Sequence, residues 1–337
     1  MKPNITSTLN RRRALTSIGV LGMMVAGLAA PAALAQSPAA YPDRAVKIVV
    51  PFAPGAGTDA MARLIAQKLG ETMKATFVVD NKAGASGAIG TQFVAQAPAD
   101  GYTLLLVASP FTTVAASVPT ANYDPLRQFA PVGMIVSGPL VWATNVALPV
   151  TDMQGLVRLA KQKPGALNYG SAGAGGVNHL VLELLKSRTG TFITHIPYRG
   201  IAPATMDMIG GQIQLITGTI PALLPFIKNG TVRPLAVTSA KRSSALPDVP
   251  SMTESGFAGI DVVNYFALMA PVGTPEPVIT ALNAAINKVV ALPEVVTRFK
   301  TDAVEAAPGS PALLGQFIEA DYQAWRNVVK TQNLKIE

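Results

Sequence analysis

The stretch VKIVVPFAPGAGTD, residues 46–59, sets the fold that we expect for this chain. Residues 46–50 are mostly β-branched and apolar, which predicts a buried strand. A loop rich in proline and glycine follows, and from Thr58 to Leu69 apolar residues recur at helical spacing. A strand, a glycine-rich loop and a helix in this order indicate α/β architecture.

The same alternation continues along the chain and predicts two sets of α/β layers. In the first set, further strands are expected at 76–80 and 102–107, with a helix near 89–96. In the second set, strands are expected at 132–136, 140–144, 167–169, 192–196, 213–217 and 233–238. Its helices are expected at 152–162, with Thr151 available as the cap, and at 177–187, 203–209 and 222–228. An apolar strand at 261–270 then precedes helices at 275–290, 294–299 and 311–330.

The C-terminal helices have no strands of their own to cover, so we expect them to pack back on the first set of layers. The chain would then cross twice between two lobes. Lobe 1 would consist of residues 36–137 and 260–337, and lobe 2 of residues 138–259. The expected hinges lie near Ser137 and Asp261.

Residues 1–35 predict an export signal. Lys2 and the run Arg11–Arg13 form a basic start without an acidic residue, and an apolar run ends in the small-x-small pattern Ala33-Leu34-Ala35. We expect cleavage after Ala35 and a periplasmic protein exported by the Sec or the twin-arginine route. A membrane anchor is the alternative, and Pro31 together with the glycines of the run weakens it.

Composition excludes several function classes. The 337 residues contain no cysteine and only two histidines, which removes disulfides, thiolate catalysis and sites built from cysteine or several histidines. The net charge is +8, and the expected export signal supplies four of the 27 basic residues. No lysine- or arginine-rich block remains beyond it, so no nucleic-acid partner is expected. We expect neither a metal nor a cofactor.

Three glycine-rich loops, at 51–59, 84–90 and 170–176, form the candidate ligand site. Each follows an expected strand and precedes an expected helix. Glycines let the backbone approach a ligand closely, and a helix N-terminus offers free N–H groups with a partial positive charge. Together these features make an anion site without any lysine or arginine. Ligands of open α/β sheets bind beyond the carboxyl ends of the strands, where these loops lie.

A dinucleotide site is the sharpest alternative. Residues 55–60 fit the pattern G-x-G-x-x-A, and Asp80 ends the next strand. The protein would then be a periplasmic NAD(P)-dependent oxidoreductase that uses the Gly55–Gly57 loop. Pro51 and Pro54 interrupt the tight junction between strand and glycine that this fingerprint needs.

Hydrolytic chemistry has weaker support. The chain has no G-x-S-x-G elbow. No sequence motif brings Ser171 or Ser86 close to His179 or His195. Only the three-dimensional geometry of such residues establishes a catalytic triad. We therefore predict a binding protein and not an enzyme.

Four further side chains have roles that the sequence leaves open. His179 lies early in the helix after the third loop, and it is either a structural histidine or a ligand contact. Tyr198 can bond to or stack on a ligand. Arg199 can pair with a carboxylate or remain a solvated surface charge. Phe52, between two prolines, is a candidate lid or wall of the pocket.

Taken together, these segments resemble the substrate-binding proteins of tripartite tricarboxylate transporters, the Bug or TctC-like family. The resemblance spans nearly all of the expected mature chain and is carried by residues 41–42, 48–55, 58–59, 62–63, 81–87, 100–105, 167–173, 179–180, 195–200, 203–204, 207, 246–250, 270–271 and 274–275. It implies a two-lobed Venus-flytrap fold of the type II-like periplasmic binding proteins with two interlobe crossovers. It also implies a small carboxylate ligand, delivered to integral-membrane transporter subunits. A sensor receptor is the alternative partner, and we expect a monomer.

By motif, the first loop would line one wall of the ligand site, and residues 171–176 and 198–200 the other. The predicted ligand-binding set is Phe52, Ala53, Gly55, Ala56, Gly57, Thr58, Asp59, Ser86, Ser109, Ser171, Ala172, Gly173, Gly175, Gly176, His179, Tyr198, Arg199 and Gly200. The chain departs from the family pattern at Ala56, where adjacent glycines are usual, at Gly176, where serine is usual, and at 265–267, where Trp-x-Gly is usual. These departures leave open whether the ligand is a dicarboxylate, an amino acid, an aromatic acid or a citrate-like acid.

Overall fold

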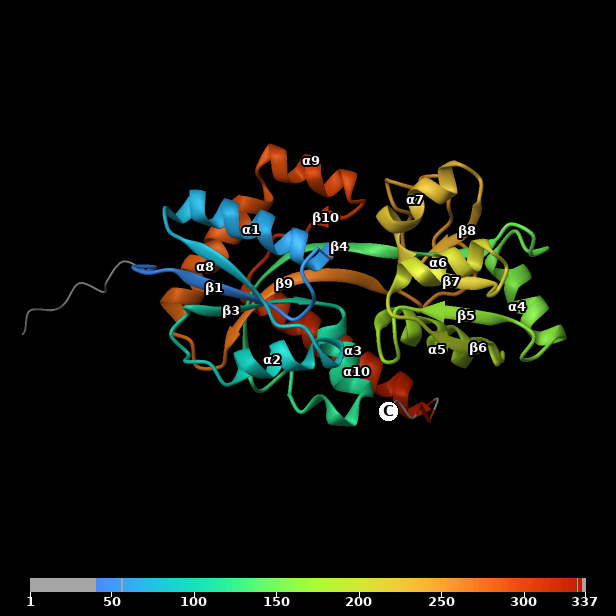
Figure 1. Ribbon diagram of the computed structural model, residues 1–337, viewed down its shortest axis with the longest axis horizontal. Helices are drawn as coiled ribbons and strands as arrows, with labels where there is room; N and C mark the ends of the chain where they lie inside the picture. Colours follow the sequence, from blue (N-terminus) through green and yellow to red (C-terminus); the bar gives the residue numbers. More distant parts are fainter. Residues whose placement is uncertain (1–40, 56, 332, 335–337) are drawn as a thin grey trace, which may run out of the picture. The chain divides into compact units, whose positions relative to one another are not determined.

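The computed structural model describes residues 41–55, 57–331 and 333–334. The expected export signal and its cleavage site at Ala35 lie outside the described residues. Within them, two sheets share one long strand, β4 (Phe129–Asn145). Figure 1 shows β4 and β9 (Val263–Pro271) running between the two sheets.

The first sheet has the strand order β2-β1-β3-β9-β4. Its strands β1 (Val46–Val50), β2 (Phe77–Asn81) and β3 (Thr103–Ala108) are parallel, whereas β9 runs antiparallel to β3 and to β4. The two-residue strand β10 (Glu305–Ala306) pairs with β4. The position of β1 between two parallel strands explains why residues 46–50 are mostly apolar. Parallel strands are covered on both faces, so both sets of their side chains are buried.

Helices cover both faces of this sheet. Val46, Ile48 and Val50 pack with α1 (Gly57–Met73), α8 (Glu276–Val290) and α9 (Pro293–Thr301) in one core cluster. Val49, on the opposite face of β1, packs with α2 (Ala88–Ala95), α3 (Pro110–Ser117) and α10 (Pro311–Thr331) in another. Successive strand side chains point to opposite faces, and this alternation separates the two cores.

The second sheet continues from β4 in the order β4-β7-β5-β6, and β8 (Val232–Val237) also pairs with β4. Strands β5 (Asn168–Ser171), β6 (Thr194–Pro197) and β7 (Leu215–Thr219) are parallel where they pair. Helices α4 (Met153–Gln162) and α5 (Val177–Thr189) pack in one cluster, and α6 (Ile201–Ile209) and α7 (Ile220–Lys228) in the other.

Strand β4 corrects one prediction. The sequence suggested separate strands at 132–136 and 140–144, because glycine and proline at 138–139 normally end a strand. In the structure the strand is continuous. Its pairing with β9 ends at Pro139, and its pairing with β7 begins at Leu140. The missing N–H of Pro139 therefore falls where β4 changes partners.

The last helix corrects a second prediction. Helices α8 and α9 do pack on the first sheet, as expected. Helix α10, however, places Leu314 and Ile318 in the core of the first sheet and Trp325 and Val328 in the core of the second. It thus joins both halves, because its 21 residues, at about 1.5 Å each, extend past the end of the first sheet.

Two smaller expectations also fail. The short helix α3 was not predicted, since its eight residues include Pro110, two threonines and a serine. Asp152, and not Thr151, caps α4: its Oδ1 accepts the Gly155 N–H at 2.6 Å. Asp is a strong N-cap because its carboxylate satisfies a free helix N–H.

Among the described residues, no single helix is both long and apolar enough to cross a membrane. Only α8 and α9 together, bent by 69°, have that length and composition.

Candidate functional site

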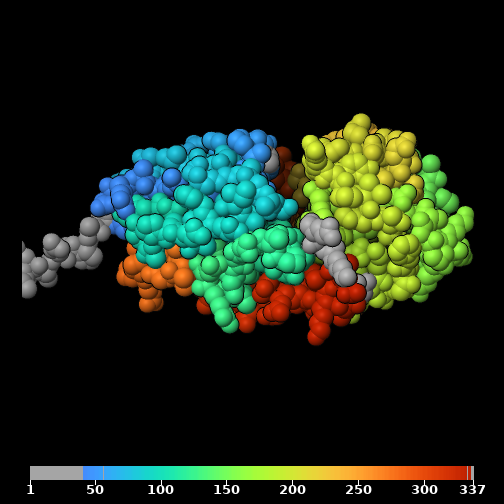
Figure 2. Space-filling view, turned by 60° about the horizontal axis from the view of Figure 1, so that its bottom comes forward, coloured from blue at the N-terminus to red at the C-terminus, as the bar shows by residue number. Residues whose placement is uncertain are grey.

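A cleft lies between the two sheets, between the start of α1 and the end of β7. A cavity of about 420 Å³ occupies part of this cleft. Gly57 and Ala60 of α1 line one side, and Thr219 and Pro221 at the end of β7 line the other. Figure 2 shows the corresponding hollow between the blue elements around α1 and the yellow elements around α7. This size is typical of small-molecule sites.

The first loop is organised around Asp59, a buried residue in the first turn of α1. Its Oδ2 accepts the Gly55 N–H and Arg63 Nε, each at 3.0 Å, and its Oδ1 accepts Asn81 Nδ2 at 3.0 Å. The hydrogen bond from Arg63, followed by that from Gly55, lowers the pKa of Asp59 to about 2. The oxygens of this carboxylate therefore accept hydrogen bonds from the loop and its neighbours, and not from a ligand.

Asn81 is a functional candidate that the site prediction missed. Its Nδ2 donates to the Phe52 carbonyl at 3.1 Å as well as to Asp59. It stands at the end of β2, next to the end of β1. An amide at a strand end, beside a loop that needs donors, is the sequence signal that would have identified it.

The remaining first-loop residues lie around this anchor. Ala53, Gly55 and Gly57 are exposed, whereas Phe52 and Thr58 are half-buried. Gly55 has φ +84°, a conformation that favours glycine. Ala56 lies outside the described residues.

The second loop supports the first. Ser86 is exposed within a short 3₁₀ turn (Ala85–Gly87), and a Cβ on Gly87 would come within 3.2 Å of the Phe52 ring. Gly87 therefore lets this loop pack against Phe52. Ser109, at the end of β3, is buried, and its Oγ donates to Asn264 Oδ1 at 2.9 Å and accepts the Tyr265 N–H at 3.3 Å. Ser109 thus joins β3 to β9, and its hydroxyl is already bonded.

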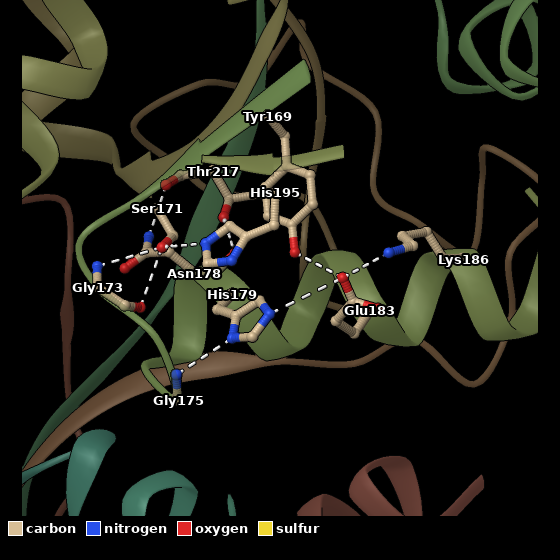
Figure 3. A network of polar contacts seen from close by, with 10 residues as sticks. All are labelled: Tyr169, Ser171, Gly173, Gly175, Asn178, His179, Glu183, Lys186, His195 and Thr217. Atoms are coloured by element: carbon tan, nitrogen blue, oxygen red, sulfur yellow. Dashed lines mark hydrogen bonds and ion pairs between the residues drawn. The ribbon is translucent and has the colours of Figure 1, made fainter. Parts of the chain in front are cut away.

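The third loop closes on itself through buried side chains (Figure 3). Ser171 Oγ accepts the Gly173 N–H at 3.1 Å and lies 2.7 Å from His195 Nε2. His179 Nδ1 accepts the Gly175 N–H at 3.1 Å. Gly173 and Gly175 have φ +131° and +77°, which only glycine adopts readily. Ala172 is exposed, and Gly176 caps α5.

A polar network supports this loop from below. The rings of His179 and His195 are stacked, and Tyr169 packs against His195. Tyr169 Oη and Lys186 Nζ both donate to Glu183 Oε1, at 2.6 and 2.7 Å (Figure 3). Burial lowers the pKa of each histidine to about 4. Both rings are therefore neutral near pH 7, which is the state in which Nδ1 of His179 can accept a hydrogen bond.

The contact between Ser171 and His195 was not expected, yet it does not form a nucleophilic pair. Ser171 is fully buried, and its hydroxyl already bonds within the loop. Within the described chain, no carboxylate hydrogen-bonds His195 to orient it, which a triad requires. His179, through the Gly175 N–H that its Nδ1 accepts, holds the backbone of this loop.

The loop after β6 packs beside the third loop. The Tyr198 N–H donates to the Ser171 carbonyl at 3.0 Å, which ties the two loops together. Tyr198 Oη donates to Asp207 Oδ2 at 2.7 Å, and burial together with Asp207 raises the pKa of Tyr198 to about 12. Arg199 is exposed, and Gly200, with φ +126°, precedes α6.

Comparison with known proteins places this geometry in a family. Residues 61–334 match the family described as the tripartite tricarboxylate transporter family receptor. The chain belongs to that family. It is 37% identical to protein BugT of Bordetella pertussis over 98% of this chain and all of that protein. The resemblance noted from sequence is thereby confirmed.

Solved structures agree with the fold. An R. palustris protein determined with adipate has a TM-score of 0.78 and 37% identity, covering 88% of this chain and 99% of its own. MatC from Rhodopseudomonas palustris, with bound malate, has a TM-score of 0.76 and 29% identity, covering 86% of this chain and all of its own. The predicted α/β periplasmic binding-protein fold is therefore correct. Members of this receptor family are periplasmic, as in the structure of the periplasmic binding protein BugD, which has a TM-score of 0.75 and 34% identity and covers 88% of this chain and 99% of its own.

Proposed function

We propose that this family member is an exported solute-binding protein that holds one small carboxylate between its two lobes and does not act as an enzyme. The observation that supports the proposal is that glycine-rich loops follow β1 and β5, the first of them supplying Gly57 to the cavity, while the polar side chains beneath both loops are already paired. What remains for a ligand is mainly backbone N–H at the starts of α1, α5 and α6. Such donors select an anion.

The predicted ligand-binding residues divide into two roles under this proposal. Ala53, Gly57, Thr58, Ala172 and Gly176 present backbone toward the ligand. Asp59, Ser109, Ser171, His179 and Tyr198 hold that backbone in place through the bonds described above. Arg199, which is exposed, would add a guanidinium at the rim that can pair with a carboxylate. The adipate and malate of the related structures support this ligand class.

Binding would close the lobes about hinges in β4 near Ser137 and just before β9 near Asp261. Lobe 1 would comprise residues 36–137 and 260–337, and lobe 2 residues 138–259. Closure removes water from the ligand and strengthens its hydrogen bonds. The closed lobe surface would then dock on integral-membrane transporter subunits or on a sensor receptor.

A dinucleotide is a poorer fit to the first loop. Gly55 follows the end of β1 by five residues, so the tight strand-to-glycine turn of the fingerprint is missing. Asp80, the expected ribose partner, lies 3.4 Å from Lys47 Nζ and 3.5 Å from Lys82 Nζ.

A thermal-shift screen of residues 36–337 against small carboxylates, with NAD(P) included, tests the proposal. A ligand at 100 times its Kd contributes about 2.7 kcal/mol, which raises the melting temperature by several degrees. The proposal predicts shifts with carboxylates and none with NAD(P). A shift with NAD(P) and with no carboxylate would overturn it.

A further inference from the structure

The cavity in the cleft runs along the first two turns of α1, beginning at Gly57 of the first glycine-rich loop. Its walls are mainly apolar and come from Met61, Leu64, Pro139, Pro221, Phe266 and Val304. Gly57, the first residue of α1, lines the same cavity. The cavity therefore joins a backbone donor region to a space that favours hydrocarbon.

The ionisable groups that line the cavity oppose a second anionic group. They are Arg298, Glu294 and Asp302, so two carboxylates stand against one guanidinium. Arg298 Nε already donates to Asp302 Oδ2 at 2.8 Å, and Glu294 pairs with Lys68 at 3.2 Å. The charged groups of this lining are thus already paired, so a second carboxylate placed here would lose hydration and find no unpaired cation among the described lining residues.

We propose that the ligand is a monocarboxylate with an apolar body, an aliphatic chain or a ring, which fills this cavity while the carboxylate binds at the loops. The inference rests on the proposed function and narrows its ligand class. It separates this chain from the relatives whose structures contain adipate or malate, which are both dicarboxylates.

Calorimetric titration of residues 36–337 with butanoate, hexanoate and adipate tests the ligand class. Hexanoate and adipate have the same chain length and differ by one carboxylate. We expect hexanoate to bind at least tenfold more tightly than adipate. We also expect about a fourfold gain for each methylene between butanoate and hexanoate, which corresponds to ~0.8 kcal/mol. Adipate binding as tightly as hexanoate overturns this inference alone, whereas no binding by any carboxylate, including those of the thermal-shift panel, overturns the proposed function as well.

A substitution tests the location. Ala60 is an exposed residue of α1 that lines the cavity, and Ala60→Phe places a ring in it. We expect the affinity for hexanoate to fall at least tenfold and that for butanoate to fall less. Ala284→Phe, at an exposed position of α8, is the matched control and should change neither affinity. Both variants should melt near the temperature of the parent protein. If they do, an unchanged affinity of Ala60→Phe for hexanoate shows that the apolar body of the ligand does not bind in this cavity.

Discussion

The imidazole rings of His179 and His195 lie face to face, with centroids 3.9 Å apart and planes inclined by 8°. One ring accepts the Gly175 N–H and the other contacts Ser171, so the pair fixes both ends of the third glycine-rich loop. Two charged rings cannot share this geometry without strong repulsion. The neutrality of the pair is therefore a condition for the shape of the binding wall.

Stability should fall in mild acid because of this pair. Each histidine has a folded pKa of about 4, below its ordinary value of 6.5, and burial is the main cause. The unfolded chain therefore binds more protons between these values, and the stabilisation present above pH 6.5 is lost as the pH falls toward 4. Glu183, Lys186 and Tyr169 face the rings, and Lys186 lowers both pKa values further.

Urea unfolding from pH 7.5 to 4.5 measures this effect. His195→Gln should flatten the decline, because it removes one titrating ring. Arg199→Gln, at an exposed position, should leave the decline intact. Asp321 acts in the opposite sense, since burial raises its pKa to about 6 and its protonation in acid favours the fold. A decline that is equally steep in His195→Gln and in the parent would contradict the assignment to the pair.

Gly173→Ala should weaken carboxylate binding by about tenfold. The residue has φ +131°, so a side chain strains the loop that presents the backbone donors, at a cost of about 1–3 kcal/mol. Gly230→Ala, at φ +74° with open space around its Cβ, is a control with strain but no place in the site. Both variants should melt earlier, and only the first should lose affinity; equal affinities would remove the third loop from the site. Gly173→Pro, which also deletes the N–H, should act in the same direction without unfolding the lobe.

Asp59→Asn should lower the affinity for carboxylates, although it removes a negative charge from the neighbourhood of an anion. The reason is that the carboxylate organises the first loop through Gly55, Arg63 and Asn81. Asp80→Asn, on the adjacent strand, removes a similar charge without entering the loop and serves as the control. Calorimetry on both variants decides the point. A rise in affinity for Asp59→Asn would mean that Asp59 acts only through its charge.

Trp325→Ala should destabilise the whole described fold. Trp325 is buried in the core of the second sheet and donates to Asp321 at 2.9 Å, while the same helix also packs on the first sheet. Truncation of a buried tryptophan typically costs about 3–5 kcal/mol. Tyr322→Ala, at a half-buried position one turn away, should cost less. The free energies of unfolding in urea compare the two directly, and equal costs would contradict the bridging role of α10.

Sequence patterns were sufficient for the parts of the fold that depend on local periodicity. The apolar run at 46–50 and the helix after Thr58 were both identified, since both faces of β1 are covered and α1 has an apolar stripe. The continuity of β4 was not predictable, because a change of strand partner at Pro139 is a tertiary event. The same holds for α10, whose apolar stripe does not reveal that it serves two cores.

The glycine-rich loops could be predicted, but the roles of their side chains could not. Asp59, Ser171 and His179 lie in the right loops, yet their polar atoms bond to the loops' own backbone. Some side chains contact a ligand directly, and others only hold the backbone that contacts it. Spacing in the sequence does not distinguish the two kinds. The stacking of His179 on His195, 16 residues apart in sequence on different elements, depends on how α5 packs beside β6.

The central claim, capture between two lobes, is most directly tested by a distance across the cleft. The chain has no cysteine, so Gln67→Cys on α1 and Lys228→Cys on α7 provide two unique labelling sites at exposed positions. Pulsed electron paramagnetic resonance on the spin-labelled protein then gives the distance distribution with and without the carboxylate that produces the largest thermal shift. Closure of the lobes predicts a shorter and narrower distribution when that carboxylate is bound, and no change with NAD(P). A distribution that stays the same at saturating carboxylate would contradict closure of the lobes around the ligand.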